Sequence, residues 1–84
     1  MDKKEEVFDV VRKALAEALE LPEEDIQWES RFKEDLEADS LDLVELLLEM
    51  ERVYGFKVED EEAKEIKTVG DAVELILRKV ATKA

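Results

Sequence analysis

A leucine-rich segment, residues 41–54, constrains the fold most, because its apolar side chains recur at helical spacing on two separate faces. At about 100° per residue, one broad face holds Leu43, Leu46, Leu47, Met50, Val53 and Tyr54. A second stripe, roughly opposite, holds Leu41, Val44 and Leu48. The flanks carry the carboxylates of Asp42, Glu45, Glu49 and Glu51. Because a helix in a small bundle buries only one face, we expect the second stripe, called here the apolar stripe, to be exposed.

Ser40 stands where a loop becomes this helix, and it is one of only two serines in the chain. Asp39 precedes it, and Leu41 and Asp42 follow it. An exposed apolar stripe with acidic flanks that starts at a lone hydroxyl indicates a docking surface built around a modifiable serine. The plain alternative is that Ser40 is only the N-cap of the helix, a position that serine favours.

Negative charge is concentrated around Ser40. Residues 34–51 carry eight acids and no base, a net charge of −8, whereas residues 52–84 carry seven acids and seven bases. The whole chain has a net charge of −12. Such a field repels nucleic acid and anionic membranes and attracts basic protein patches. We therefore expect protein partners with basic surfaces, no nucleic acid and no membrane insertion.

The residue types that are missing argue against several classes of function. The chain has no histidine and no cysteine, and these are the commonest acid–base, nucleophilic and transition-metal side chains. We expect a non-enzyme that is itself a substrate of other enzymes, with no metal site, since the acidic residues 59–62 lack the spacing and glycine of a calcium loop. The lack of cysteine fits a reducing cytoplasm. No apolar run is long enough for a transmembrane span or a signal peptide.

The rest of the chain predicts three further helices. Residues 3–20 repeat apolar side chains at three- and four-residue steps, namely Val7, Val11, Ala14, Leu15 and Ala18. Pro22 ends this helix. Asp60 is a candidate cap for a short helical turn over residues 61–66. Thr68 and Asp71 fit a capping box that begins a last helix, whose apolar side consists of Val69, Ala72, Val73, Ile76, Leu77 and Val80.

A long loop, residues 21–39, joins the first two helices. Its scattered apolar residues are expected to anchor it to the bundle: Ile26, Trp28, Phe32 and Leu36. Ser30 is a candidate cap for a turn through Lys33 or Glu34, and Gly55 suits a left-handed helix end. The predicted architecture is all-α: a small four-helix bundle of three main helices and one short third helix. We expect a single domain over residues 1–84, without internal repeats.

The segment LEADSLDLVELLLEMERVYGF, residues 36–56, resembles the core of the acyl carrier proteins, whose Asp-Ser-Leu motif opens the second helix. The similarity covers nearly the whole chain, since the DEEAKEI turn and the TVGDAVELI helix follow in the order typical of the family. The resemblance implies that Ser40 carries 4′-phosphopantetheine, transferred from coenzyme A. The thiol of that arm would hold growing acyl chains as thioesters in fatty acid biosynthesis.

The resemblance also implies the partners and the cargo site. A phosphopantetheinyl transferase and the fatty-acid-synthesis enzymes would bind through basic patches to a recognition strip made of Asp39, Leu41, Asp42, Val44, Glu45, Leu48, Glu49 and Glu51. The acyl tail would enter an acyl pocket between the second and third helices, lined by Phe32, Leu46, Leu47, Met50, Val58, Ala63 and Ile66. We expect a monomer.

The sequence alone leaves other functions open. A D-alanyl, peptidyl or polyketide carrier would use the same serine and arm, whereas a designed or consensus acidic bundle would use Ser40 only as a cap. Three positions depart from the family pattern, one of them Glu59, which stands where proline is frequent before the acidic turn. Glu37 stands where glycine is common, which predicts a different conformation of the loop before Ser40. Arg52 places a positive charge on a face that many members keep acidic, which predicts a narrower set of partners.

Overall fold

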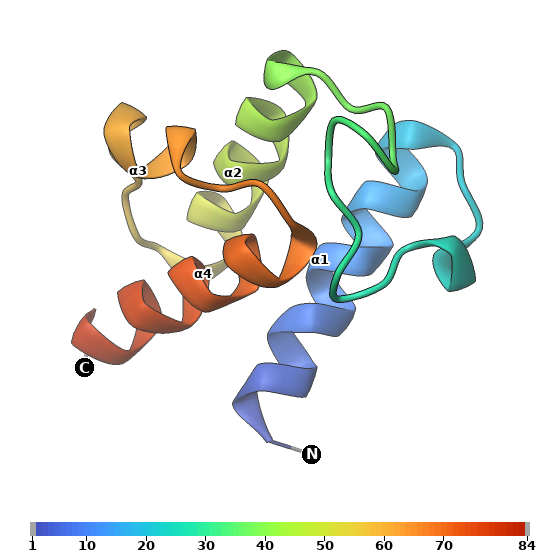
Figure 1. Ribbon diagram of the computed structural model, residues 1–84. Helices are drawn as coiled ribbons and strands as arrows, with labels where there is room; N and C mark the ends of the chain where they lie inside the picture. The colour runs from blue at the N-terminus through green and yellow to red at the C-terminus, as the bar shows by residue number, and fades with distance from the viewer. Residues whose placement is uncertain (1, 84) are drawn as a thin grey trace.

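The computed structural model describes the backbone of residues 2–83 and the side chains of residues 2–81. Within that part of the chain four α-helices form the predicted all-α bundle (Figure 1): α1 (Lys3–Leu19), α2 (Ser40–Tyr54), α3 (Asp60–Lys64) and α4 (Val69–Lys83). A short 3-10 turn, η1 (Glu23–Asp25), lies in the long first loop. No helix in the described residues is long and apolar enough to cross a membrane.

The helix ends follow from local side-chain chemistry. Asp2 caps α1 by accepting the Glu5 N–H at 2.9 Å. The helix ends one residue earlier than predicted, because Glu20 turns to the left-handed region at φ 57°. The predicted capping box of α4 is confirmed: the Asp71 N–H donates to Thr68 Oγ1, and Asp71 Oδ2 accepts from the Thr68 N–H, both at 3.1 Å.

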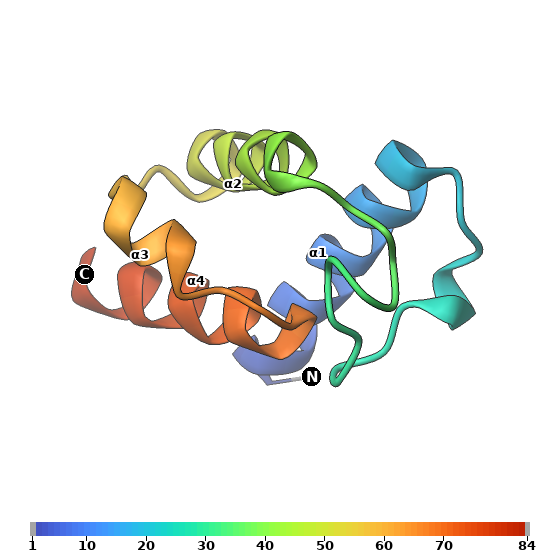
Figure 2. The ribbon, with the colours of Figure 1, turned by 45° about the horizontal axis from the view of Figure 1, so that its top comes forward.

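The short third helix begins earlier than predicted. Asp60 is its first helical residue rather than its cap, and the helix covers Asp60–Lys64 instead of residues 61–66. The reason is that the carboxylate of Glu62 accepts the Glu59 N–H at 2.9 Å, which makes Glu59 the capping residue. Figure 2 shows α3 at one end of the molecule, between α2 and α4.

One apolar core fills the bundle. α1 packs chiefly against α4, and their fully buried residues include Val7, Val11, Leu15, Val69, Val73 and Ile76. Two residues predicted to face inward are exposed instead, Val53 and Ala18. Val53 lies at the edge of its apolar face and near the end of its helix, and helix packing covers the centre of such a face first. Ala18 lies near the end of α1, where it borders an open groove between α1 and α2.

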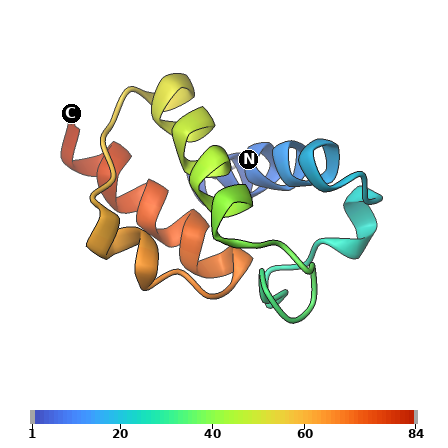
Figure 3. The same ribbon diagram turned by 90° about the horizontal axis from the view of Figure 1, so that it is seen from above.

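The first loop lies beside the segment that begins α4 (Figure 3), and backbone hydrogen bonds connect the two. The Phe32 N–H donates to the Lys67 carbonyl at 3.0 Å, and the Val69 N–H donates to the Ser30 carbonyl at 2.9 Å. The Gly70 N–H donates to the Trp28 carbonyl at 2.8 Å. The loop is therefore held by backbone hydrogen bonds in addition to its predicted apolar anchors, of which Ile26, Phe32 and Leu36 are buried and Trp28 is half-buried.

Trp28 and Ser30 have specific places in this loop. The Trp28 ring meets Phe8 edge-on, with 5.5 Å between centroids, and it leaves no room for a side chain at Gly70, where a Cβ would lie 2.4 Å from the indole nitrogen. The prediction that Ser30 caps a turn through Lys33 or Glu34 is wrong. Its hydroxyl is buried and accepts the Gln27 N–H at 2.9 Å, because the turn that it closes lies before it.

Candidate functional site

Ser40 is the first residue of α2, and its side chain is exposed. The N-cap is Asp39, whose Oδ1 accepts the Asp42 N–H at 3.0 Å, while Asp42 Oδ2 accepts the Asp39 N–H at 3.1 Å. The alternative role of Ser40 as N-cap is therefore wrong. Within the side chains that the structure describes, the Ser40 hydroxyl makes no hydrogen bond. This hydroxyl therefore has no part in capping the helix.

The loop before Ser40 is fixed by two features. Ala38 is buried, and its N–H donates to the Phe32 carbonyl at 2.7 Å. Glu37 has a φ of 53°, in the left-handed region that glycine adopts without cost. The glutamate thus takes a conformation suited to a glycine, and the predicted difference of this loop from the family pattern stays a prediction. Together these residues turn the chain from the core to the surface two residues before the serine.

The apolar stripe is exposed, as predicted. Leu41, Val44 and Leu48 have exposed fractions of 65%, 45% and 57%, whereas Leu46, Leu47 and Met50 have 5%, 4% and 1%. Exposed leucines scattered singly need no explanation, but three on one face of one helix form a contiguous surface. The stripe therefore offers apolar contact beginning directly beside Ser40.

The carboxylates of the recognition strip differ in how free they are. Asp39 and Asp42 are used in the capping box. Glu49 forms an ion pair with Arg52. The Glu51 carboxylate accepts the Val58 N–H at 2.6 Å and so holds the segment that follows α2. Among the described carboxylates of this strip, Glu45 alone is exposed and has no hydrogen bond or ion pair.

Comparison with known proteins agrees with this geometry. Residues 9–76 match the family described as "Phosphopantetheine attachment site". The chain is 43% identical over 74 residues to an acyl carrier protein of Rubrobacter xylanophilus, covering 88% of this chain and 91% of that protein. It is 44% identical over 75 residues to an acyl carrier protein of Borreliella burgdorferi, covering 89% and 94%. The chain belongs to the acyl carrier protein family.

Solved structures of acyl carrier proteins share the fold. The crystal structure of the protein from Thermotoga maritima superposes with a TM-score of 0.85 at 25% identity and covers 96% of this chain and 94% of that one. The protein from Enterococcus faecalis gives a TM-score of 0.77 at 33% identity, with 93% and 99% covered. The cofactor of the family is phosphopantetheine.

The start of α2 suits a phosphopantetheine group. The first N–H groups of a helix have no partner within it, and the capping box uses only those of Asp39 and Asp42. The N–H groups of Ser40 and Leu41 remain, together with the positive end of the helix dipole, beside the Ser40 hydroxyl. A phosphodiester on Ser40 would lie next to both, which is a favourable place for an anion.

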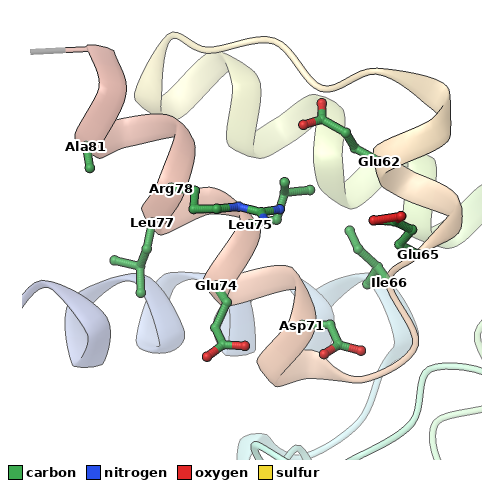
Figure 4. A pocket seen from close by; sticks show the side chains of 9 residues that line it. All are labelled: Glu62, Glu65, Ile66, Asp71, Glu74, Leu75, Leu77, Arg78 and Ala81. Atoms are coloured by element: carbon green, nitrogen blue, oxygen red, sulfur yellow. The ribbon is translucent and has the colours of Figure 1, made fainter.

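The predicted acyl pocket of this acyl carrier protein coincides with filled core. Five of its residues are buried, namely Phe32, Leu46, Leu47, Met50 and Ile66, and Val58 and Ala63 are half-buried. An open hollow of about 630 Å³ lies instead between α3 and α4 (Figure 4). Of the predicted residues it includes only Ile66. Glu62, at its edge, pairs with Lys79 at 2.8 Å, and this ammonium lowers the pKa of the Glu62 carboxyl.

Proposed function

We propose that the Ser40 hydroxyl is the attachment point of 4′-phosphopantetheine and that the chain carries acyl groups on this arm in fatty acid biosynthesis. The observation that carries the proposal is the contrast between the two serines. Ser40 is exposed and its hydroxyl has no partner among the described residues, whereas Ser30 is buried and its hydroxyl is engaged. The flanking residues perform the capping, so modification of Ser40 leaves the helix start intact.

The residues of this chain have limited and specific roles in the transfer. The Ser40 oxygen attacks the coenzyme A phosphorus that carries the pantetheine arm, a new O–P bond forms, and the pyrophosphate bond breaks to release adenosine 3′,5′-bisphosphate. The serine proton goes to a base of the transferase, since this chain has no histidine or cysteine. Asp39 and Asp42 hold the helix start in place. When attached, the arm supplies a thiol that holds acyl groups as thioesters.

The recognition strip is the proposed contact surface for the transferase and for the fatty-acid-synthesis enzymes. Leu41, Val44 and Leu48 supply apolar contact, and Glu45 supplies an unpaired charge for basic patches on those enzymes. Contacts of this kind are weak and screened by salt. Weak binding suits a carrier, because it has to leave each enzyme after one step.

We propose that the chain acts as a monomeric, single-domain and non-catalytic carrier in the cytoplasm. Two copies that met through the apolar stripe would bring two regions of net charge −8 together, which disfavours a dimer. The absence of cysteine fits a reducing compartment. The acidic, base-free region around Ser40 also disfavours anionic membranes and nucleic acid as partners.

Intact mass after incubation with coenzyme A and a broad-specificity phosphopantetheinyl transferase tests the attachment. The wild-type chain should gain the mass of one arm, and Ser40→Ala should gain nothing. Ser30→Ala is the matched control and should gain one arm like the wild type. An arm that still appears on Ser40→Ala would place the attachment elsewhere and reject the assignment.

A further inference from the structure

The outward face of α2 changes charge along its length. Arg52 follows Leu41 by eleven residues and Leu48 by four, so these three side chains share one face of the helix. Arg52 is the first base after Lys33 in the sequence, and its side chain is 75% exposed. The unpaired Glu45 lies on the flank of the same face, closer to Ser40. This face is therefore acidic near the serine, and at its far end it carries the positive charge of Arg52 beside its ion-pair partner Glu49.

We infer that Arg52 selects partner enzymes whose docking surface carries the complementary division of charge. This inference rests on the proposed function, because it concerns enzymes that reach the arm on Ser40. Such a partner carries a basic group opposite Glu45, about 8 Å along the helix from Ser40, and a carboxylate opposite Arg52, about 18 Å from Ser40 at 1.5 Å per residue. Enzymes with basic groups along the whole surface meet Arg52 as a like charge and bind less well.

The Arg52–Glu49 ion pair does not remove this preference. Both side chains are largely exposed, at 75% and 46%, and an exposed pair three residues apart on a helix contributes little to stability. The guanidinium has five N–H donors, of which the Glu49 contact uses one nitrogen. A carboxylate of a partner can therefore bind the remaining donors while Glu49 stays in place, or can replace Glu49 at small cost.

Binding to a panel of carrier-dependent 3-ketoacyl synthases tests the inference. The panel contains enzymes with a carboxylate about 18 Å from the active-site entrance along the docking surface, and enzymes that are basic throughout. Arg52→Glu should weaken binding to the first group and tighten binding to the second, each by about fivefold, the factor expected for one exposed charge pair. Arg52→Gln should lie between the wild type and Arg52→Glu.

Arg31→Glu is the matched control. Arg31 also pairs with an acid three residues away, Glu34, and is also exposed, but it lies in the first loop and not on α2. Arg31→Glu makes the same change in net charge and should change the binding affinity for both groups of enzymes by the same factor. The inference is overturned if Arg52→Glu leaves the ranking of the panel unchanged, or if Arg31→Glu changes the ranking in the same way.

A charge exchange separates this inference from the proposed function. Replacing the partner's carboxylate with lysine should weaken binding to the wild-type chain, and Arg52→Glu should restore it. Lack of restoration contradicts the pairing. The measurement uses both the apo chain and the chain loaded on Ser40. Failure of loading rejects the proposed attachment, whereas the binding of the apo chain still decides whether Arg52 selects the partner.

Discussion

Asp39 and Asp42 cap each other's backbone N–H groups across the start of α2, at 3.0 and 3.1 Å, with the Ser40 hydroxyl left free between them. The serine is thus placed by its neighbours and contributes nothing to the capping itself. The proposed attachment residue and the capping residues at this helix end are different residues, and the effects of replacing each can be measured separately.

The first prediction is that Ser40→Ala changes the free energy of unfolding by less than about 0.5 kcal/mol, as for an ordinary surface substitution. Asp39→Ala should cost about 1 kcal/mol, the usual effect of removing an N-cap side chain. Urea unfolding of the two variants beside the wild type makes the comparison. A loss in Ser40→Ala as large as that in Asp39→Ala would show that the serine caps the helix.

The second prediction concerns Glu37, which is held at a φ of 53°. A residue with a Cβ in the left-handed region costs about 1–2 kcal/mol. Glycine removes this cost, but it loses more conformational entropy on folding, which cancels part of the gain. Glu37→Gly should therefore raise the melting temperature by a few degrees. Glu37→Ala removes the same charge but keeps a Cβ, so it should not give this increase. If the two variants melt at the same temperature, any increase over the wild type comes from removal of the Glu37 charge and not from the backbone conformation.

The third prediction tests the recognition strip. Glu45→Lys in the loaded chain should weaken binding to a carrier-dependent synthase by about fivefold or more, because an attraction becomes a repulsion. Glu24→Lys makes the same charge change on η1, away from α2, and should have a smaller effect. Added salt should weaken the wild-type complex through screening. Binding that is indifferent to both Glu45→Lys and salt would rule out electrostatic docking through this strip.

The fold was predicted from the sequence to the extent that local chemistry determines it. The spacing of Leu41, Val44 and Leu48 against Leu46 and Met50 was enough to separate the exposed face of α2 from the buried one. The capping box of Thr68 and Asp71 was also readable from two residue types three positions apart.

Features that depend on contacts distant in sequence were not predicted. Ser30 is buried because the loop is bonded to the segment before α4, and no local pattern shows that pairing. The hydrogen bond from the Val58 N–H to the Glu51 carboxylate depends on how the chain turns back toward α2 after Gly55. The hollow between α3 and α4 likewise follows from how two separate helices meet, which the periodicity of each helix does not specify.

The fourth prediction is a pH dependence that involves Glu62. Its hydrogen bond to the Lys79 ammonium lowers its pKa from 4.5, and the Glu59 N–H acts in the same direction. The ionised carboxylate therefore stabilises the fold above its unfolded pKa, and this stabilisation is lost as the pH falls through the lower folded pKa. Glu62→Gln should reduce the decrease in melting temperature between pH 5 and pH 3.

The control for this experiment is Glu65→Gln. Glu65 is exposed and lies near the same helix, and among the described residues its carboxylate has no ion pair. With Glu65→Gln, the decrease in melting temperature between pH 5 and pH 3 should stay close to that of the wild type. If Glu62→Gln and Glu65→Gln give the same curve, the Lys79 contact does not couple Glu62 to stability.

The fifth prediction concerns the acyl pocket. Each methylene that enters apolar surroundings stabilises the loaded chain by up to about 0.8 kcal/mol, less the cost of opening filled core around Met50 and Ile66. The protein should thus melt at increasing temperatures when its arm carries acyl groups of about two, six and ten carbons, until the pocket is full. Trp28 fluorescence follows the unfolding.

Chemical shifts of core methyl groups identify where the tail lies. Shifts at Leu46 and Leu47 that grow with chain length indicate entry between α2 and α3. Shifts at Leu75 and Leu77 indicate the hollow between α3 and α4 instead. Identical melting temperatures for all three arms, without chain-length-dependent shifts at either place, would mean that the tail stays in solvent.

The backbone pairing between the first loop and the residues before and within the first turn of α4 has a consequence for synthesis on the ribosome. The carbonyls of Trp28 and Ser30 and the N–H of Phe32 find their hydrogen-bond partners at residues 67–70, and closing so long a loop has to await those residues. While the chain is still being translated, the segment that presents Ser40 lacks the partners that shape it. A transferase that requires this shape would therefore act only after residues 67–70 have left the ribosome, and a translation product that lacks them would escape modification.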